Sequence, residues 1–232
     1  MKSSFLLPLL IVLAGCRNPA PGYVPVPPEE IPKVSFDSVK DAKDLMPLAV
    51  GNHWTYQYDT QNYDKAGKPE KPFGGKANID IAARWPNGTG VLVVSQSGNV
   101  VDRQAWFGDD KGMLQVEGGV EGTAYRPGLP AFTLPLAAGK RFEWRGSGPT
   151  PLGGSASMTA QGEILEPQNV DLAKGTVSAI PIVTRIAFPG GNTVSTSWFR
   201  PGVGLVRLHQ ETTGRGIRTV TTLALIEHKN PQ

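Results

Sequence analysis

The stretch GNHWTYQYDT, residues 51–60, alternates large aromatic and small polar side chains. Trp54, Tyr56 and Tyr58 are two residues apart, and Thr55 and Gln57 lie between them. Successive side chains of a β-strand point to opposite faces, so this pattern puts the three aromatics on one face and the polar residues on the other. The segment is therefore predicted to be a half-buried strand with an aromatic inner face.

The same period of two recurs along the chain between turn signals. Further strands are expected at 91–94, 100–107, 113–116, 142–145, 180–188, 193–199, 202–208 and 219–227. Turn signals are Asn87-Gly88, Gly98-Asn99, Asp109 to Gly112, and Pro189 to Asn192. With 28 Gly and 21 Pro, tight turns are frequent and helix is scarce. We expect an all-β fold with ten to twelve strands in antiparallel sheets, arranged as a curved sheet, a barrel-like sheet or a sandwich.

Two parts of the chain have similar sequences. Met46–Tyr56 lines up without a gap with Leu134–Trp144, and Trp106-Phe107 corresponds to Trp198-Phe199. A period of about 90 residues is too long for a solenoid repeat. We expect a β-domain at 47–228 made of two similar modules, at about 47–125 and 134–228. Chance similarity between hairpins is the alternative.

The N-terminus has the pattern of an export signal. Lys2 precedes the ten-residue apolar run Phe5–Ala14, which is too short for the roughly 20 residues that a membrane span needs. The run ends in Leu13-Ala14-Gly15-Cys16, which resembles the lipobox of bacterial lipoproteins. The resemblance implies that residues 1–15 are a signal peptide and that Cys16 becomes a lipidated N-terminus. The alternative is an ordinary secretory signal with a chance cysteine.

The region after Cys16 is expected to be a tether. Cys16 is the only cysteine, so it has no disulfide partner in the chain, and lipidation would consume its thiol. The tether is expected at residues 16–34; within it, the proline-rich stretch Arg17–Lys33 favours an extended chain, which could span up to roughly 50 Å at about 3.1 Å per residue. Arg17 follows the cysteine, where an Asp marks inner-membrane retention in enteric-type bacteria. The periplasmic side of the outer membrane is expected in a Gram-negative cell.

Residues 35–46 are expected to form a short helix or part of the linker. Val39, Ala42 and Leu45 fall on one helical face, Asp37 or Ser38 could cap the helix, and Pro47 would stop it.

No residue pattern indicates catalysis, a metal or a cofactor. The three histidines, His53, His209 and His228, lack the spacing of a zinc site. Asp109 and Asp110 could join Asp102 or Glu117 as a carboxylate pair, but a tight turn explains them more simply. Nearly balanced charge, 23 Lys+Arg against 20 Asp+Glu, argues against nucleic acid as a partner.

Basic side chains could form a contact surface. Arg200, Arg207, Arg215 and Arg218 could touch anionic lipid or cell-wall polymer, although solvated strand positions are the more common outcome.

Two segments resemble a poorly characterised group of exported bacterial proteins that includes TapB-like lipoproteins. Asp44–Tyr58 carries the pattern PL-x-x-G-x-x-W-x-Y, and Ser195–Glu211 carries W-[YF]-x-P-G-V-G-L-V-[KR]. In the middle, a valine-rich strand, Gly175-Thr176 and a second strand span Val170–Ile182. The group has no established activity. Some members resemble the outer-membrane lipoprotein carrier fold, which implies a curved antiparallel sheet around an apolar cavity.

These observations predict a lipid-anchored envelope protein whose β-domain binds or scaffolds without catalysis. In one version the domain carries or sequesters a lipid or another apolar ligand, and in another it contacts envelope proteins. A hydrolase with an unrecognised site is the third possibility. The candidate ligand-binding residues are the aromatics Trp54, Tyr56, Trp106, Trp144 and Trp198.

Overall fold

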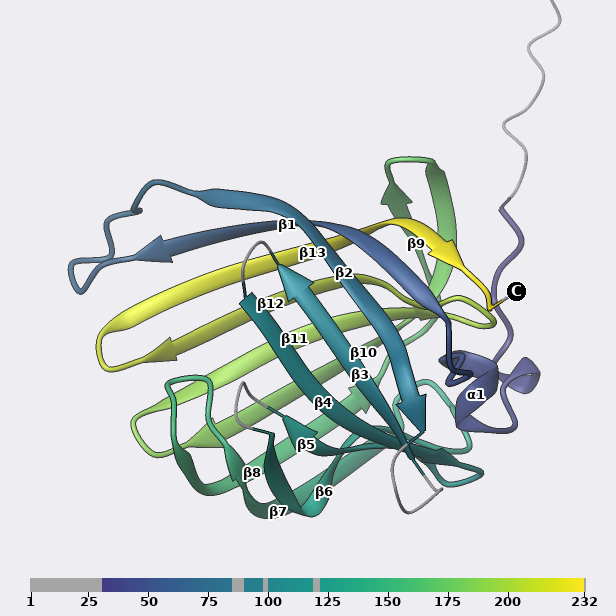
Figure 1. Ribbon diagram of the computed structural model, residues 1–232, viewed down its shortest axis with the longest axis horizontal. Coiled ribbons are helices and arrows are strands. Elements are labelled where there is room, and N and C mark those ends of the chain that lie inside the picture. The colour runs from purple at the N-terminus through teal and green to yellow at the C-terminus, as the bar shows by residue number, and fades with distance from the viewer. Residues whose placement is uncertain (1–30, 85–89, 98–99, 119–121, 232) are drawn as a thin grey trace, which may run out of the picture. The chain divides into compact units, whose positions relative to one another are not determined.

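The computed structural model describes residues 31–84, 90–97, 100–118 and 122–231 of the 232-residue chain (Figure 1). Two short helices precede the strands, a 3-10 turn at Phe36–Ser38 and α1 at Ala42–Leu45. The strands are β1 His53–Tyr63, β2 Phe73–Arg84, β3 Gly90–Ser97, β4 Val100–Asp109, β5 Gly112–Gly118, β6 Thr123–Thr133, β7 Arg141–Pro149, β8 Ser155–Ile164, β9 Gln168–Leu172, β10 Gly175–Phe188, β11 Gly191–Arg200, β12 Gly204–Gly214 and β13 Ile217–Lys229.

All of these strands belong to one antiparallel sheet that closes on itself. Most neighbours in the sequence are neighbours in the sheet, β13 returns to pair with β1, and β10 pairs with both β8 and β11. Twelve strands therefore form a ring, and β9 pairs with the first part of β10 outside it. The predicted all-β antiparallel fold with little helix is confirmed.

The strand count exceeds the expected ten to twelve by one, and β2, β6 and β8 lie outside the ranges at which strands were expected. The strand β2 has the sequence FGGKANIDIAAR, in which two glycines and three adjacent small or apolar residues blur the alternation. The predicted turns at 109–112 and 189–192 connect β4 to β5 and β10 to β11. The predicted turns at 87–88 and 98–99 lie outside the described residues.

Neighbouring strands of the ring differ in how many residues they pair. The pair β1–β13 is matched along eleven residues of β1, whereas the described part of β6 pairs with β7 only at Arg126 and Ser147. A side-chain hydrogen bond adds to this junction, because the indole Nε1 of Trp144 donates to the carbonyl oxygen of Pro127 at 3.1 Å. We call this β6–β7 junction the seam.

Residues 34–48, here called the plug, cover one end of the ring (Figure 1). Val39, Ala42 and Leu45 are buried, as the predicted helical face requires, and they pack in one cluster with side chains of the sheet such as Phe132 and Phe199. Full burial of a side chain such as Leu45 contributes about 1.5–3 kcal/mol. The plug therefore seals this end with apolar contacts.

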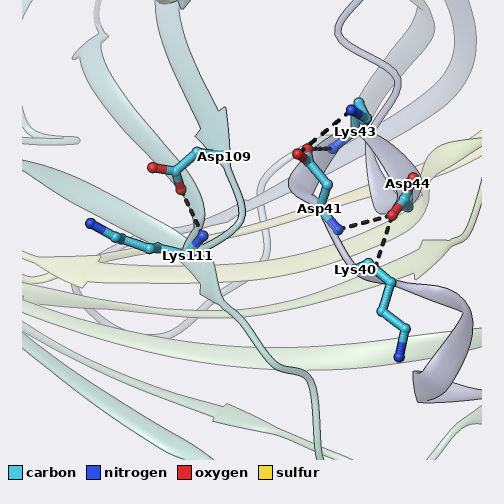
Figure 2. Close-up of polar contacts among 6 residues, drawn as sticks. All are labelled: Lys40, Asp41, Lys43, Asp44, Asp109 and Lys111. Carbon is cyan, nitrogen blue, oxygen red and sulfur yellow. Dashed lines mark hydrogen bonds and ion pairs between the residues drawn. The ribbon is translucent and has the colours of Figure 1, made fainter.

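The cap of α1 differs from the expectation. Backbone at Val39 is extended, so the segment forms two short helices in place of one. The N-cap of α1 is Asp41, not Asp37 or Ser38: its carboxylate accepts from the Lys43 amide at 3.0 Å. The Asp44 carboxylate accepts from the backbone amides of Lys40 and Asp41, both at 2.9 Å (Figure 2). These bonds satisfy amides that a helix start otherwise leaves unpaired.

Among the described residues, no helix has the length and apolar character required to cross a membrane.

Candidate functional site: an apolar cavity inside the ring

A cavity of about 300 Å³ lies inside the ring of strands. Ten of the twelve ring strands, all except β7 and β8, contribute to its wall, and Met46 and Leu48 of the plug close it at one end. Its apolar lining comprises Met46, Leu48, Tyr56, Ile79, Val93, Trp106, Met113, Leu129, Pro130, Ala131, Ile186, Phe199, Leu205, Leu208 and Leu223. Concave, mostly apolar sites of this size bind small ligands.

A minority of the lining side chains are polar. They are Gln115, Thr184, Ser195, Ser197 and Gln210. Further toward the end of the ring away from α1, hydroxyls face each other between neighbouring strands: Thr60 and Thr221 are 3.2 Å apart, and Thr193 and Thr212 are 3.0 Å apart. The interior is therefore apolar beside the plug and more polar toward the other end.

Tyr56, one of the predicted ligand-binding residues, lines the cavity from β1. Its side chain is fully buried, and its hydroxyl donates to the Leu205 carbonyl oxygen at 2.8 Å. Burial holds the pKa of this phenol far above its usual range. The ring is thus fixed as a neutral wall of the cavity.

Trp106, a second predicted residue, lines the cavity from β4 and begins a chain of polar contacts. Its indole Nε1 donates to Oε1 of Gln104 at 2.9 Å, and Nε2 of Gln104 donates to Oδ2 of Asp102 at 2.7 Å. The three residues are two apart, so they share the inner face of β4. The other carboxylate oxygen, Oδ1 of Asp102, is buried without a hydrogen-bond partner in the described structure.

The other three predicted aromatics do not line this cavity. Trp54 is fully buried, donates to the Val203 carbonyl oxygen at 2.6 Å and stacks on His228 with ring centroids 4.9 Å apart. Trp144 packs on Tyr125 edge to face, in a cluster with Leu129, Met158, Ala160 and Phe188.

Trp198 lies in a different setting from the other aromatics. It packs with Val170 of β9 and Val206, and the Arg207 guanidinium lies 5.7 Å from its ring centroid. The five predicted residues are therefore not brought together: Tyr56 and Trp106 share the cavity.

Sequence reasoning missed most of the lining. The serines Ser195 and Ser197 share a face of β11 with Phe199, and Leu223 shares a face of β13 with Thr221. The alternating pattern contained this information, because residues of equal parity share a face. Choosing aromatics alone left these smaller side chains out.

Other candidate chemistry lies away from the cavity. His53 Nδ1 is 2.6 Å from Asp80 Oδ1, and His53 Nε2 is 3.1 Å from Thr55 Oγ1. His53 and Thr55 have the parity opposite to Trp54 and Tyr56, and Asp80 of β2 pairs with His53, so all three lie on the outer face of the sheet. The Asp109 carboxylate accepts from the Lys111 amide at 2.8 Å, as its predicted role in the turn requires (Figure 2).

Within the described part of the chain, no three His, Cys, Asp or Glu residues are grouped to hold a metal ion. The predicted lipid attachment site, Cys16, lies outside the described residues.

Comparisons with known proteins give a distant likeness in fold. No protein-family model and no curated protein matches the chain. A protein of Parabacteroides distasonis assigned as a lipoprotein is 14% identical, with a TM-score of 0.36, over 79% of this chain and 97% of its own. A Bacteroides fragilis protein assigned as exported, with a YmcC-like fold, is 11% identical, with a TM-score of 0.28, over 80% and 99%. At these values neither protein's role can be carried over to this chain.

Proposed function

We propose that the β-domain binds an apolar or amphipathic ligand, with its hydrocarbon part in the central cavity, and performs no chemistry on it. The observation that carries the proposal is the cavity itself, with its apolar lining and about 300 Å³ of space. Apolar cavities of about 150 Å³ hold a benzene molecule, so this one has room for on the order of ten carbon atoms.

The expected affinity is moderate. Each buried methylene contributes about 0.8 kcal/mol, so ten would give about 8 kcal/mol before the costs of association. A gain of that size corresponds to a dissociation constant of about 1 μM or weaker. The cavity therefore suits a carrier or sequestering protein, which must also release its ligand.

The lipid anchor is a separate part of this proposal, and its support is the sequence Leu13-Ala14-Gly15-Cys16. The protein is exported, cut before Cys16 and held by acyl chains on that residue, on the periplasmic side of the outer membrane in a Gram-negative cell. Growth with an alkyne-bearing palmitate should label the wild-type chain and leave Cys16→Ala unlabelled. Equal labelling of both, or labelling of neither, would contradict the anchor.

Ligand binding can be tested with prodan, a neutral fluorophore that has no hydrogen-bond donor and brightens in apolar sites. The protein is the chain from residue 16 onward with Cys16→Ser, so that no lipid is attached. The variant Ser197→Leu adds volume inside the cavity, and Thr196→Leu makes a similar change on the opposite face of β11. We expect prodan to bind the parent and the Thr196 variant, and to bind the Ser197 variant at least several-fold more weakly.

Thermal unfolding of each variant shows whether it is folded at the assay temperature. Equal prodan binding by the Ser197 and Thr196 variants would place the probe elsewhere and contradict the proposal. Absence of binding to the folded parent would also contradict it. Native mass spectrometry of the parent then asks whether a cellular lipid is retained. A parent that binds no probe and retains no lipid would favour a structural role in the envelope.

A further inference from the structure

The polar contacts that start at Trp106 bear on which ligand the cavity accepts, an inference that rests on the proposed function. Trp106, Gln104 and Asp102 occupy successive inner positions of β4. The turn between β4 and β5 lies at the end of the ring near the plug, since Gly108 approaches Leu48 and Ala42. The run from Trp106 to Asp102 therefore leads from the cavity toward the more polar end.

The Gln104 amide donates to one of the two carboxylate oxygens of Asp102. Its oxygen accepts from Trp106 Nε1 at 2.9 Å, which leaves its nitrogen as the end facing the carboxylate. That nitrogen donates to Oδ2 of Asp102 at 2.7 Å. Because both ends of the amide are engaged, Gln104 supplies one donor to Asp102 and leaves Oδ1 free.

The other carboxylate oxygen of Asp102, Oδ1, has no hydrogen-bond donor among the described residues. Oδ1 is buried and has no donor within hydrogen-bond distance among the described residues, and no ion pair found among those residues involves Asp102. A buried carboxylate oxygen without a donor is costly, because it has lost its hydration without replacement. A donor that enters with a ligand would remove this cost.

Asp102 also acts on Tyr125 of β6. Burial, and to a smaller extent the charge of Asp102, raises the pKa of Tyr125 to about 12, so the phenol is neutral near pH 7.

We propose that the ligand is an amphiphile whose head carries an N–H or O–H donor, and that Oδ1 of Asp102 accepts from that head while the hydrocarbon chain fills the cavity. An ammonium head forms the strongest contact, because both partners are charged. A carboxylate head is disfavoured by repulsion from Asp102. The site thus selects amines and alcohols over fatty acids.

The test compares three ten-carbon ligands, decylamine, decanol and decanoate, as competitors of bound prodan near pH 7. The parent should bind the amine most tightly and the carboxylate most weakly. In Asp102→Asn, which keeps the shape and removes the charge, the amine should bind about tenfold more weakly and decanoate several-fold more tightly. The matched control is Asp59→Asn, which removes the same charge from an exposed position on β1. It should leave the ranking unchanged.

The outcomes separate the two proposals. If prodan binds but Asp102→Asn leaves the ranking of the three competitors unchanged, the headgroup inference is overturned and the cavity proposal stands. If Asp59→Asn changes the ranking as much as Asp102→Asn does, overall charge decides the preference and the inference also falls. If the folded parent does not bind prodan, both proposals are overturned.

Discussion

The clearest prediction on stability concerns Gly162 in β8. Gly162 pairs with Phe142 of β7, and a methyl group added at Gly162 would overlap the Phe142 ring. Phe142 cannot move aside freely, because it is buried in the cluster that also holds Leu45 of the plug. Gly162→Ala should therefore force the aromatic side chain out of its packed position.

The magnitude follows from two opposing effects. Overpacking of a core costs about 1–3 kcal/mol, and replacing glycine by alanine restores about 0.4–1 kcal/mol by restricting the unfolded chain. Gly162→Ala should thus lower the free energy of unfolding by about 1–2 kcal/mol. The control is Gly75→Ala in β2, where the added methyl would lie 3.4 Å from Tyr58, an ordinary contact. This variant should be as stable as the parent or slightly more stable.

Urea unfolding followed by tryptophan fluorescence measures both variants. A smaller side chain at position 142 should relieve the overlap, so Phe142→Leu should cost less in the Gly162→Ala background than in the parent. Such coupling between contacting residues is what a double-mutant cycle detects. Equal stability of the Gly162 and Gly75 variants, or additive effects of the two substitutions, would refute the packing argument.

Three further predictions concern the plug and the wall of the ring. Leu45→Ala should destabilise the domain by about 2–5 kcal/mol, because Leu45 is fully buried; a loss below 1 kcal/mol in urea unfolding would contradict its role in the seal. Hydrogen bonds from two backbone amides lower the pKa of Asp44 from 3.8, so its carboxylate stabilises the folded state above that pH and loses this effect as the pH falls through the lowered value. The difference in melting temperature between the parent and Asp44→Ala should be constant from pH 7 to 5 and shrink below about pH 4; a gap that persists at pH 2 would contradict this. Asp102→Asn should lower the pKa of Tyr125 from about 12, measured by ultraviolet absorbance of the phenolate, and an unchanged pKa would mean that the carboxylate does not act on Tyr125.

Local alternation predicted the strands but could not predict how the ring closes. The pattern around Trp54 and Tyr56 indicated a half-buried strand, and both side chains are fully buried. The pairing of β1 with β13 joins His53 to Lys229, and no local signal in either segment specifies the other. Closure depends on this long-range pairing, so the cavity could not be located from the sequence.

Strand parity and an irregularity in β12 explain which side chains reach the cavity. Phe199 lines the cavity while Trp198, of opposite parity on β11, packs with Val170 of β9. The register shift in this pairing lies on β12, where Leu205 and Leu208 both line the cavity although they are three residues apart. A shift of one residue changes which face a side chain occupies. The sequence does not mark such a position, so a large aromatic can be recognised as buried without showing which space it borders.

The seam between β6 and β7 has a consequence for how ligands reach the interior. One pair of residues, Arg126 and Ser147, joins these strands in the described structure, while β5 and β6 approach the cavity through Gln115 and Leu129. Separation at this edge breaks few backbone hydrogen bonds and leaves every other ladder intact, so it needs less free energy than opening at any well-paired edge. The amide protons of β6 and β7 that face the seam should then exchange with solvent sooner than those between β1 and β13. A bulky molecule could enter sideways between these two strands without dislodging the plug.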